Sequence, residues 1–76
     1  MRIVRLYTSD NCPFCKIVES YLRCLEIPFG EIITIETINI DEIEVNNITT
    51  LPTIAIEGNY YPGIMDKEIL REIVLS

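Results

Sequence analysis

The stretch Cys12-Pro13-Phe14-Cys15 decides how the rest of the chain is interpreted. It follows a short apolar run that ends at Tyr7, and it opens a helical pattern of apolar residues. Two cysteines separated by two residues can close a disulfide across one helical turn, and the same spacing can supply half of a metal site. The sequence therefore places sulfur chemistry at the start of a helix.

The order of residues within this motif favours redox chemistry. Pro13 suits the first helical position, because its missing N–H would be unpaired there, and this makes Cys12 the helix cap. The cap faces the free backbone N–H groups of Phe14 and Cys15, and the helix dipole favours an anion there. Cysteines at such positions have pKa values lowered to roughly 3.5–7.5. We expect Cys12 to be the exposed nucleophile, Lys16 to stabilise its thiolate and Cys15 to be the more buried resolving thiol.

Length and composition indicate a single domain over residues 1–76, in which 49% of the residues are apolar. No apolar run reaches the roughly 18 residues of a membrane span. The N-terminus is interrupted by Arg2 and Arg5 and lacks the apolar core of a signal peptide. We therefore expect a cytoplasmic protein, and in that compartment a C-x-x-C motif is typically catalytic or metal-binding.

The net charge of −6 limits the expected partners. Contacts to phosphates need clustered Lys and Arg, so an acidic chain argues against nucleic acid. We expect a monomer that binds neither nucleic acid nor membrane. The acid excess indicates a solvated surface, or else electrostatic steering towards a basic partner.

Apolar periodicity predicts strands at residues 3–7, 29–40, 53–57 and 60–61, and helices at residues 13–26 and 67–75. Pro28 is expected to lie just past the end of the first helix. Gly58-Asn59 is expected to form the turn between the last two strands, and Asp66 to cap the last helix. Residues 41–50 are interpreted as a short helix or an irregular turn. The expected buried stripes of the two helices are Ile17, Val18, Tyr21, Leu22 and Leu25, and Ile69, Leu70, Ile73 and Val74.

Three signals occur in a specific order: the cysteine motif, the step Glu26-Ile27-Pro28-Phe29, and Leu51-Pro52-Thr53. Together they resemble the thioredoxin fold in its small, glutaredoxin-like form, over nearly the whole chain. The resemblance implies a minimal α/β thioredoxin fold of the order β-α-β-(short helix or loop)-β-β-α, with a four-stranded mixed sheet. It also implies a thiol–disulfide oxidoreductase.

The resemblance assigns substrate binding to residues around the cysteine pair. It implies that Pro52 follows a cis peptide bond beside the cysteines, and that the Leu51 backbone pairs with a substrate peptide or glutathione. The alternative is that Pro52 merely begins an edge strand. Pro13 and Phe14 are also expected at the substrate site, where Phe14 either presents an apolar face to substrates or packs inward.

The first hypothesis for function is an enzyme that reduces protein or low-molecular-weight disulfides through Cys12 and Cys15, with no required metal or organic cofactor. Its reductant is either glutathione, which is then a co-substrate, or an enzyme similar to thioredoxin reductase. Glutaredoxins usually carry a glutathione-binding lysine where this chain has Ser9. The region of Gly63 partly resembles the redoxins associated with ribonucleotide reductase, so both sources of electrons stay open.

The second hypothesis is a metal- or iron–sulfur-binding module. Zinc commonly takes four Cys or His ligands, whereas the chain has three cysteines and no histidine. A dimer that shares Cys12 and Cys15 could complete such a site. Cys24 is expected to be a small, partly buried filler, or else an exposed thiol open to modification. It lies about 18 Å along the helix from Cys12, too far to resolve a disulfide there.

Overall fold

The computed structural model describes residues 2–42, 48, 50–63 and 66–75. The elements are β1 (Arg2–Thr8), α1 (Pro13–Phe29), β2 (Ile33–Asn39), β3 (Thr53–Ile56), β4 (Asn59–Pro62) and α2 (Lys67–Leu75). This order confirms the predicted succession of strands and helices. The short helix or irregular turn expected within residues 41–50 falls largely on residues 43–47 and 49, which lie outside the described part of the chain.

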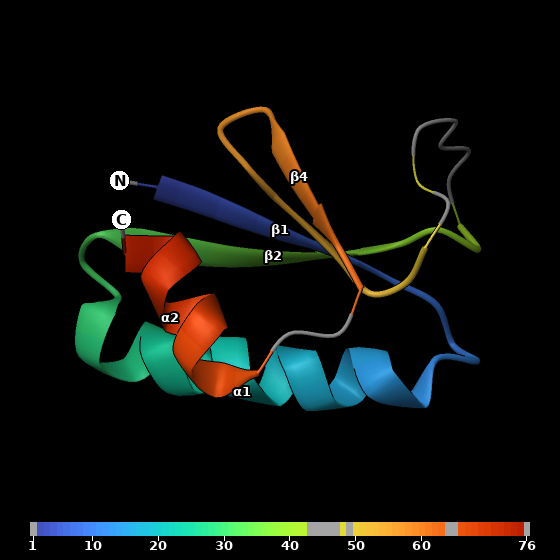
Figure 1. The fold of residues 1–76 in the computed structure, drawn as a ribbon, viewed down its shortest axis with the longest axis horizontal. Coiled ribbons are helices and arrows are strands. Elements are labelled where there is room, and N and C mark those ends of the chain that lie inside the picture. The colour runs from blue at the N-terminus through green and yellow to red at the C-terminus, as the bar shows by residue number, and fades with distance from the viewer. Residues whose placement is uncertain (1, 43–47, 49, 64–65, 76) are drawn as a thin grey trace.

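The four strands form one mixed sheet in the order β2-β1-β3-β4. β1 and β2 run parallel, and β3 is antiparallel to both β1 and β4. The helix α1 connects the parallel pair as in a βαβ unit. Figure 1 shows α1 and α2 on the same side of the sheet. The central position of β1 places the loop that follows it, with the cysteine motif, at the end of the sheet.

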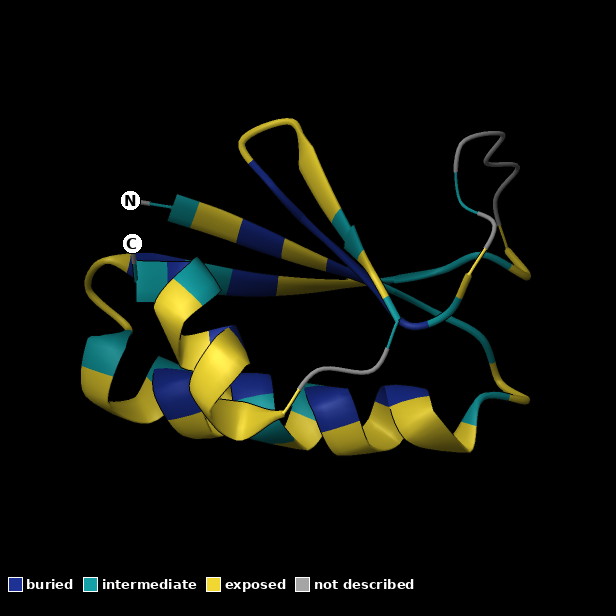
Figure 2. Ribbon diagram, viewed as in Figure 1, coloured by how far each residue is buried: buried dark blue, intermediate teal, exposed yellow. Residues whose placement is uncertain are grey.

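The core lies between the sheet and the two helices, and Figure 2 shows the buried side of α1 turned towards the strands. Its members are Val4, Leu6, Val18, Leu22, Leu25, Ile33, Ile35, Ile54, Ile56, Leu70 and Val74. Two predicted core residues are wrong, because Ile17 and Ile69 are each 46% exposed. Each lies at the edge of its helix's apolar stripe, and a side chain at that position around the helix axis points partly towards solvent.

The first helix is longer than predicted. It continues to Phe29 with Pro28 inside its last turn, so the expected helix end at residue 26 is wrong. A proline there removes only one helical hydrogen bond, to the carbonyl of residue 24. The extra turn lets Phe29 pack against the core, with the guanidinium of Arg71 at 6.0 Å from its ring. The strand predicted from residue 29 consequently begins only at Ile33.

The hairpin between β3 and β4 turns one residue earlier than predicted. Ile56 pairs with Asn59, so the two turn residues are Glu57 and Gly58 rather than Gly58-Asn59. Both have positive φ, 51° and 85°, as a type I′ turn requires. In β4, Tyr60 is 45% exposed while Tyr61 packs against the core, as expected for alternating residues of a strand.

The second helix begins where the sequence predicts. The Asp66 side chain accepts a hydrogen bond of 2.9 Å from the backbone N–H of Ile69, which confirms it as the cap. At the other end of α2, Nη1 of Arg2 donates a hydrogen bond of 2.7 Å to the Val74 carbonyl. Arg2 thus fastens the last turn of α2 to the first residue of β1.

Candidate active site

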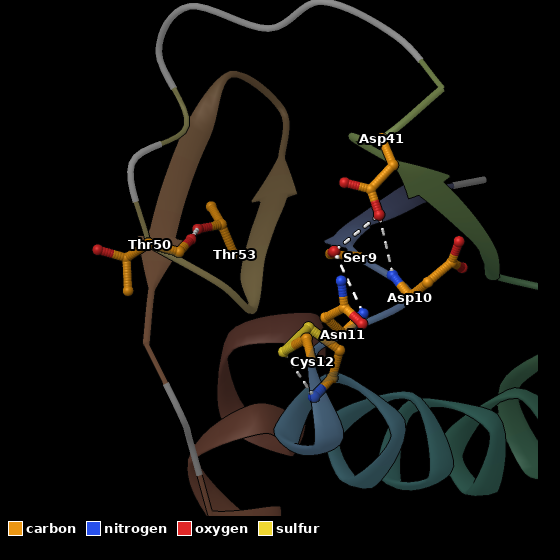
Figure 3. Close-up of a disulfide and its surroundings, with 8 residues drawn as sticks. Ser9, Asp10, Asn11, Cys12, Asp41, Thr50 and Thr53 are labelled. Atoms are coloured by element: carbon orange, nitrogen blue, oxygen red, sulfur yellow. Dashed lines mark hydrogen bonds between the residues drawn. A yellow bond between two sulfur atoms is a disulfide. The ribbon is translucent and has the colours of Figure 1, made fainter.

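Three segments meet where β1 ends. The loop to α1 follows Thr8, and the parallel strand β2 ends beside it because Thr8 pairs with Asn39. Tyr7 pairs with Thr53 in the antiparallel strand β3, so the residues before Thr53 lie at the same end of the sheet. Figure 3 draws side chains from all three segments around the cysteine pair.

Cys12 and Cys15 are joined by a disulfide across the first turn of α1, with their Cα atoms 5.3 Å apart. Cys12 is the helix cap, with extended backbone angles of φ −110° and ψ 97°, and Pro13 occupies the first turn. Sγ of Cys12 accepts a hydrogen bond of 3.2 Å from the backbone N–H of Cys15. The predicted cap geometry is confirmed, and it presents a sulfur to the positive end of the helix dipole.

The two sulfurs differ in accessibility. Cys15 is 1% exposed, whereas Cys12 is only half-buried. An incoming thiol or disulfide therefore reaches Cys12 first. Phe14 between them is 50% exposed, which favours its reading as an apolar surface beside the site over inward packing. Lys16 and Pro13 are exposed in the same first turn of the helix.

The peptide bond between Leu51 and Pro52 is cis, as the resemblance implied. Pro52 is buried, and its carbonyl accepts a hydrogen bond of 2.9 Å from the backbone N–H of Gly63. The hydroxyl of Thr53 donates to the carbonyl of Thr50, which braces the same segment. The Leu51 backbone makes no hydrogen bond to any other residue that the structure describes.

The sequence analysis missed a polar network beside the cysteine motif. The Asp41 carboxylate accepts hydrogen bonds from the Ser9 hydroxyl and the Asp10 N–H, and Nδ2 of Asn39 donates to the Asp10 carboxylate. A signal was present in the sequence: polar residues directly follow two strands of a βαβ unit, whose carboxyl ends meet at one edge. The separation of about thirty residues hid the pairing.

Cys24 is a free thiol and is exposed, so the filler reading is wrong. It lies between the exposed Arg23 and the buried Leu25, and lines a surface hollow with Lys67 and Arg71 of α2. Within the described residues, no group of three or more His, Cys, Asp or Glu side chains is arranged to hold a metal ion. The two described helices also lack the length and apolar character needed to cross a membrane.

Comparison with solved structures finds the same fold in several proteins. A malarial protein superposes with a TM-score of 0.84 at 18% identity, covering 99% of this chain and 94% of its own. The germline-specific thioredoxin Deadhead of Drosophila melanogaster gives 0.85 at 19% identity, covering 97% and 78%. A mutant thioredoxin from Halobacterium salinarum gives 0.82 at 16% identity, covering 96% and 71%. These likenesses establish the thioredoxin-like fold.

No curated protein matches the sequence of this chain. The glutaredoxin family model matches residues 4–61, a range that begins within β1, includes the cysteine pair, α1 and the cis-proline, and ends within β4. The chain belongs to the glutaredoxin family.

Proposed function

We propose that this protein is a thiol–disulfide oxidoreductase that uses Cys12 and Cys15 as a dithiol pair. The observation that carries the proposal is the position of the pair: the accessible sulfur caps a helix, and its partner lies one turn inward and is buried. An anionic sulfur at the cap is stabilised by the N–H of Cys15 and by the helix dipole. These are the conditions that lower a thiol pKa and favour nucleophilic attack.

The reaction follows from the two accessibilities. The Cys12 thiolate attacks one sulfur of a substrate disulfide, forms a mixed disulfide and releases the other substrate sulfur as a thiolate. Cys15 then loses its proton and attacks Sγ of Cys12, which releases the second substrate thiolate and leaves the Cys12–Cys15 disulfide. Two external thiols, or one dithiol, supply the two electrons that reduce that disulfide and become a disulfide themselves. The substrate gains two electrons, and the protein loses two.

Substrate binding is proposed at the surface around Cys12. Among the described residues the Leu51 backbone has no hydrogen-bond partner, so it is available to an extended substrate chain, whereas the Pro52 carbonyl is bonded to Gly63. The exposed ring of Phe14 and the adjacent Pro13 offer an apolar contact. Lys16 is proposed to favour the thiolate of Cys12. We propose that the protein acts as a monomer in the cytoplasm, on disulfide-containing proteins or small disulfides.

The source of electrons separates two versions of this function. The glutaredoxin family uses glutathione, and membership supports glutathione as co-substrate. The serine at position 9, where glutaredoxins usually have a lysine, supports recharging by an enzyme similar to thioredoxin reductase.

The test is the reduction potential of the pair. The protein is equilibrated in glutathione buffers without oxygen and its thiols are alkylated and counted by mass, with Cys24 as a constant addition. A potential of about −270 mV or lower supports a thioredoxin-like reductant recharged by a reductase, and about −200 to −230 mV supports use of glutathione. If Cys12 and Cys15 remain thiols at every ratio, the oxidoreductase proposal is wrong. Zinc or iron in anaerobically purified protein would then support the metal-binding alternative.

A further inference from the structure

The loop between β1 and α1 is fastened to the chain that follows β2 by one side chain. Oδ2 of Asp41 accepts a hydrogen bond of 2.8 Å from Oγ of Ser9 and another of 3.2 Å from the backbone N–H of Asp10. Figure 3 shows both bonds reaching the same oxygen. A single carboxylate oxygen thus holds two successive residues of the loop that leads to the cysteine motif.

A short chain of hydrogen bonds continues from Asp41 to Cys12. The Ser9 carbonyl accepts a bond of 3.2 Å from the backbone N–H of Cys12, and Oγ of Ser9 accepts one of 3.4 Å from the N–H of Asn11. The orientation of Ser9 therefore sets the position of the Cys12 backbone. That backbone must keep its extended cap conformation for Sγ to face the N–H of Cys15.

The carboxylate of Asp41 is itself held in place. Its own backbone N–H donates a bond of 2.9 Å to Oδ1 of Asn39, the last residue of β2. Nδ2 of the same asparagine donates a bond of 2.9 Å to the Asp10 carboxylate. Asn39 thus links the end of β2 to both acidic residues.

We propose that Asp41 is a positioning residue for the nucleophile: through Ser9 and the Asp10 N–H it keeps Cys12 in the cap conformation that stabilises its thiolate. The inference rests on the proposed role of Cys12 as nucleophile. Asp41 does not touch a substrate or the reacting sulfur and acts through the loop alone. The known chemistry of a C-x-x-C pair does not require this contact.

The charge of Asp41 makes the proposal testable. A carboxylate near a thiolate disfavours the anion, as does Asp10, whereas Lys16 favours it. Removal of the Asp41 charge alone should therefore leave Cys12 unchanged or make it more reactive. Loss of the positioning contact should make Cys12 less reactive. The two roles predict changes of opposite sign.

The experiment measures the rate at which iodoacetamide alkylates Cys12 in the fully reduced protein, as a function of pH, by mass analysis of peptides. Cys24, exposed on the same helix, is the internal reference. Asp41→Ala should slow Cys12 at neutral pH by about three- to tenfold, the effect of losing one exposed, solvent-screened charged hydrogen bond, and move its pH profile upwards. Asp41→Asn should restore most of the rate, because one amide oxygen can accept both bonds.

Glu42→Ala is the matched control. It removes the same charge from the adjacent residue, whose exposed carboxylate makes no hydrogen bond to a described residue of the loop. Its Cys12 rate should stay within about twofold of the parent, since exposed charges interact weakly. An unchanged or faster Cys12 in Asp41→Ala overturns the proposal, and so does an equal loss in Asp41→Ala and Glu42→Ala.

A second variant, and a test of disulfide formation in the parent protein, cover the cases in which Asp41→Ala does not fold or the proposed function fails. If Asp41→Ala does not fold, Ser9→Ala removes the hydroxyl that bonds to Asp41 and to the Asn11 N–H but leaves the Asp41 bond to the Asp10 N–H, and it should slow Cys12 by a smaller factor. An unaltered rate in Ser9→Ala then overturns the proposal. Alkylation needs no disulfide substrate, so the outcome is independent of turnover. Failure of the proposed function would appear instead as a parent protein whose Cys12 and Cys15 never oxidise to a disulfide.

Discussion

The backbone N–H of Cys15 points at Sγ of Cys12 from 3.2 Å, although Cys15 is itself 1% exposed. The residue that we propose resolves a mixed disulfide thus also donates a backbone hydrogen bond to the sulfur proposed as the nucleophile. A substitution of the Cys15 side chain leaves this N–H in place. Replacement of Cys12 should therefore affect the attack on the substrate, and replacement of Cys15 the later release of the mixed disulfide.

We expect Cys12→Ser to abolish disulfide-reducing turnover, because the accessible nucleophile is lost. Cys15→Ser should instead accumulate a covalent mixed disulfide between Cys12 and the substrate, since the resolving thiol is absent. Turnover with a protein disulfide and the intact mass of the products measure the two effects. Cys24→Ser is the control and should keep full activity. Turnover by Cys12→Ser at the parent rate would contradict the assignment.

Phe14→Ala tests the apolar surface beside the pair. The ring is 50% exposed, so its removal should raise KM for a protein disulfide by about fivefold, an interface contact of about 1 kcal/mol, and leave stability nearly unchanged. The KM for a small disulfide should change much less. Ile27→Ala, at an 88% exposed position near the far end of α1, is the control. Equal effects on large and small substrates would show that Phe14 acts on the cysteines instead.

Gly63→Ala tests the support of the cis-proline. Gly63 has a φ of +94° with open space around its Cα, so the cost of a Cβ is conformational, about 1 kcal/mol. Gly58→Ala, with a φ of +85° and equal space, should lose similar stability in urea unfolding. Only Gly63→Ala should also lower activity, because alanine disfavours the positive φ that points the N–H of residue 63 at the Pro52 carbonyl. Full activity in Gly63→Ala would show that the hydrogen bond between Gly63 and Pro52 is not needed for activity.

Leu22→Ala tests the core beneath the sheet. The side chain is fully buried at the centre of α1, and its truncation should cost about 2–5 kcal/mol of unfolding free energy. That is a large part of the roughly 5–15 kcal/mol that holds a typical domain folded. Chemical denaturation measures the change, and Ile27→Ala should fall within about 0.5 kcal/mol of the parent. A loss of unfolding free energy in Leu22→Ala as small as that in Ile27→Ala would show that Leu22 is not part of the core.

Arg2→Ala tests the link between β1 and α2. Arg2 donates to the Val74 carbonyl at 2.7 Å and lies 3.4 Å from the Glu57 carboxylate, with its side chain 25% exposed. We expect a loss of about 1 kcal/mol in thermal or urea unfolding. Arg5→Ala is the matched comparison: its ion pair with Glu36 is about half exposed on both sides and should contribute almost nothing. Equal losses would indicate that charge rather than the carbonyl contact is responsible.

The order of elements and the helix cap could be predicted from the sequence because their causes are local. Pro13 after Cys12 fixes a helix start, and Asp66 fixes another, with signals only a few residues long. The length of α1 could not be predicted, since Pro28 favours a helix end locally. The gain from packing Phe29 against the core appears only once the sheet and α2 are in place.

The candidate active site also contains features that could be predicted from the sequence and features that could not. The cysteine motif and the cis-proline carry recognisable patterns, and both lie where expected. The Asp41 contacts could not be predicted, because they depend on the register that brings the end of β2 beside the end of β1. The exposure of Cys24 depends on the rotation of α1 over the sheet, which an apolar stripe defines only to within a margin.

The hydrogen bond between Arg2 and Val74 also fixes where the two ends of the described chain lie. Figure 1 shows both ends on the side of the molecule opposite the loop that joins β1 to α1. A fused domain or a surface anchor attached there points away from the cysteine pair. Immobilised on a surface through either end, the protein would therefore present Cys12 to the solution.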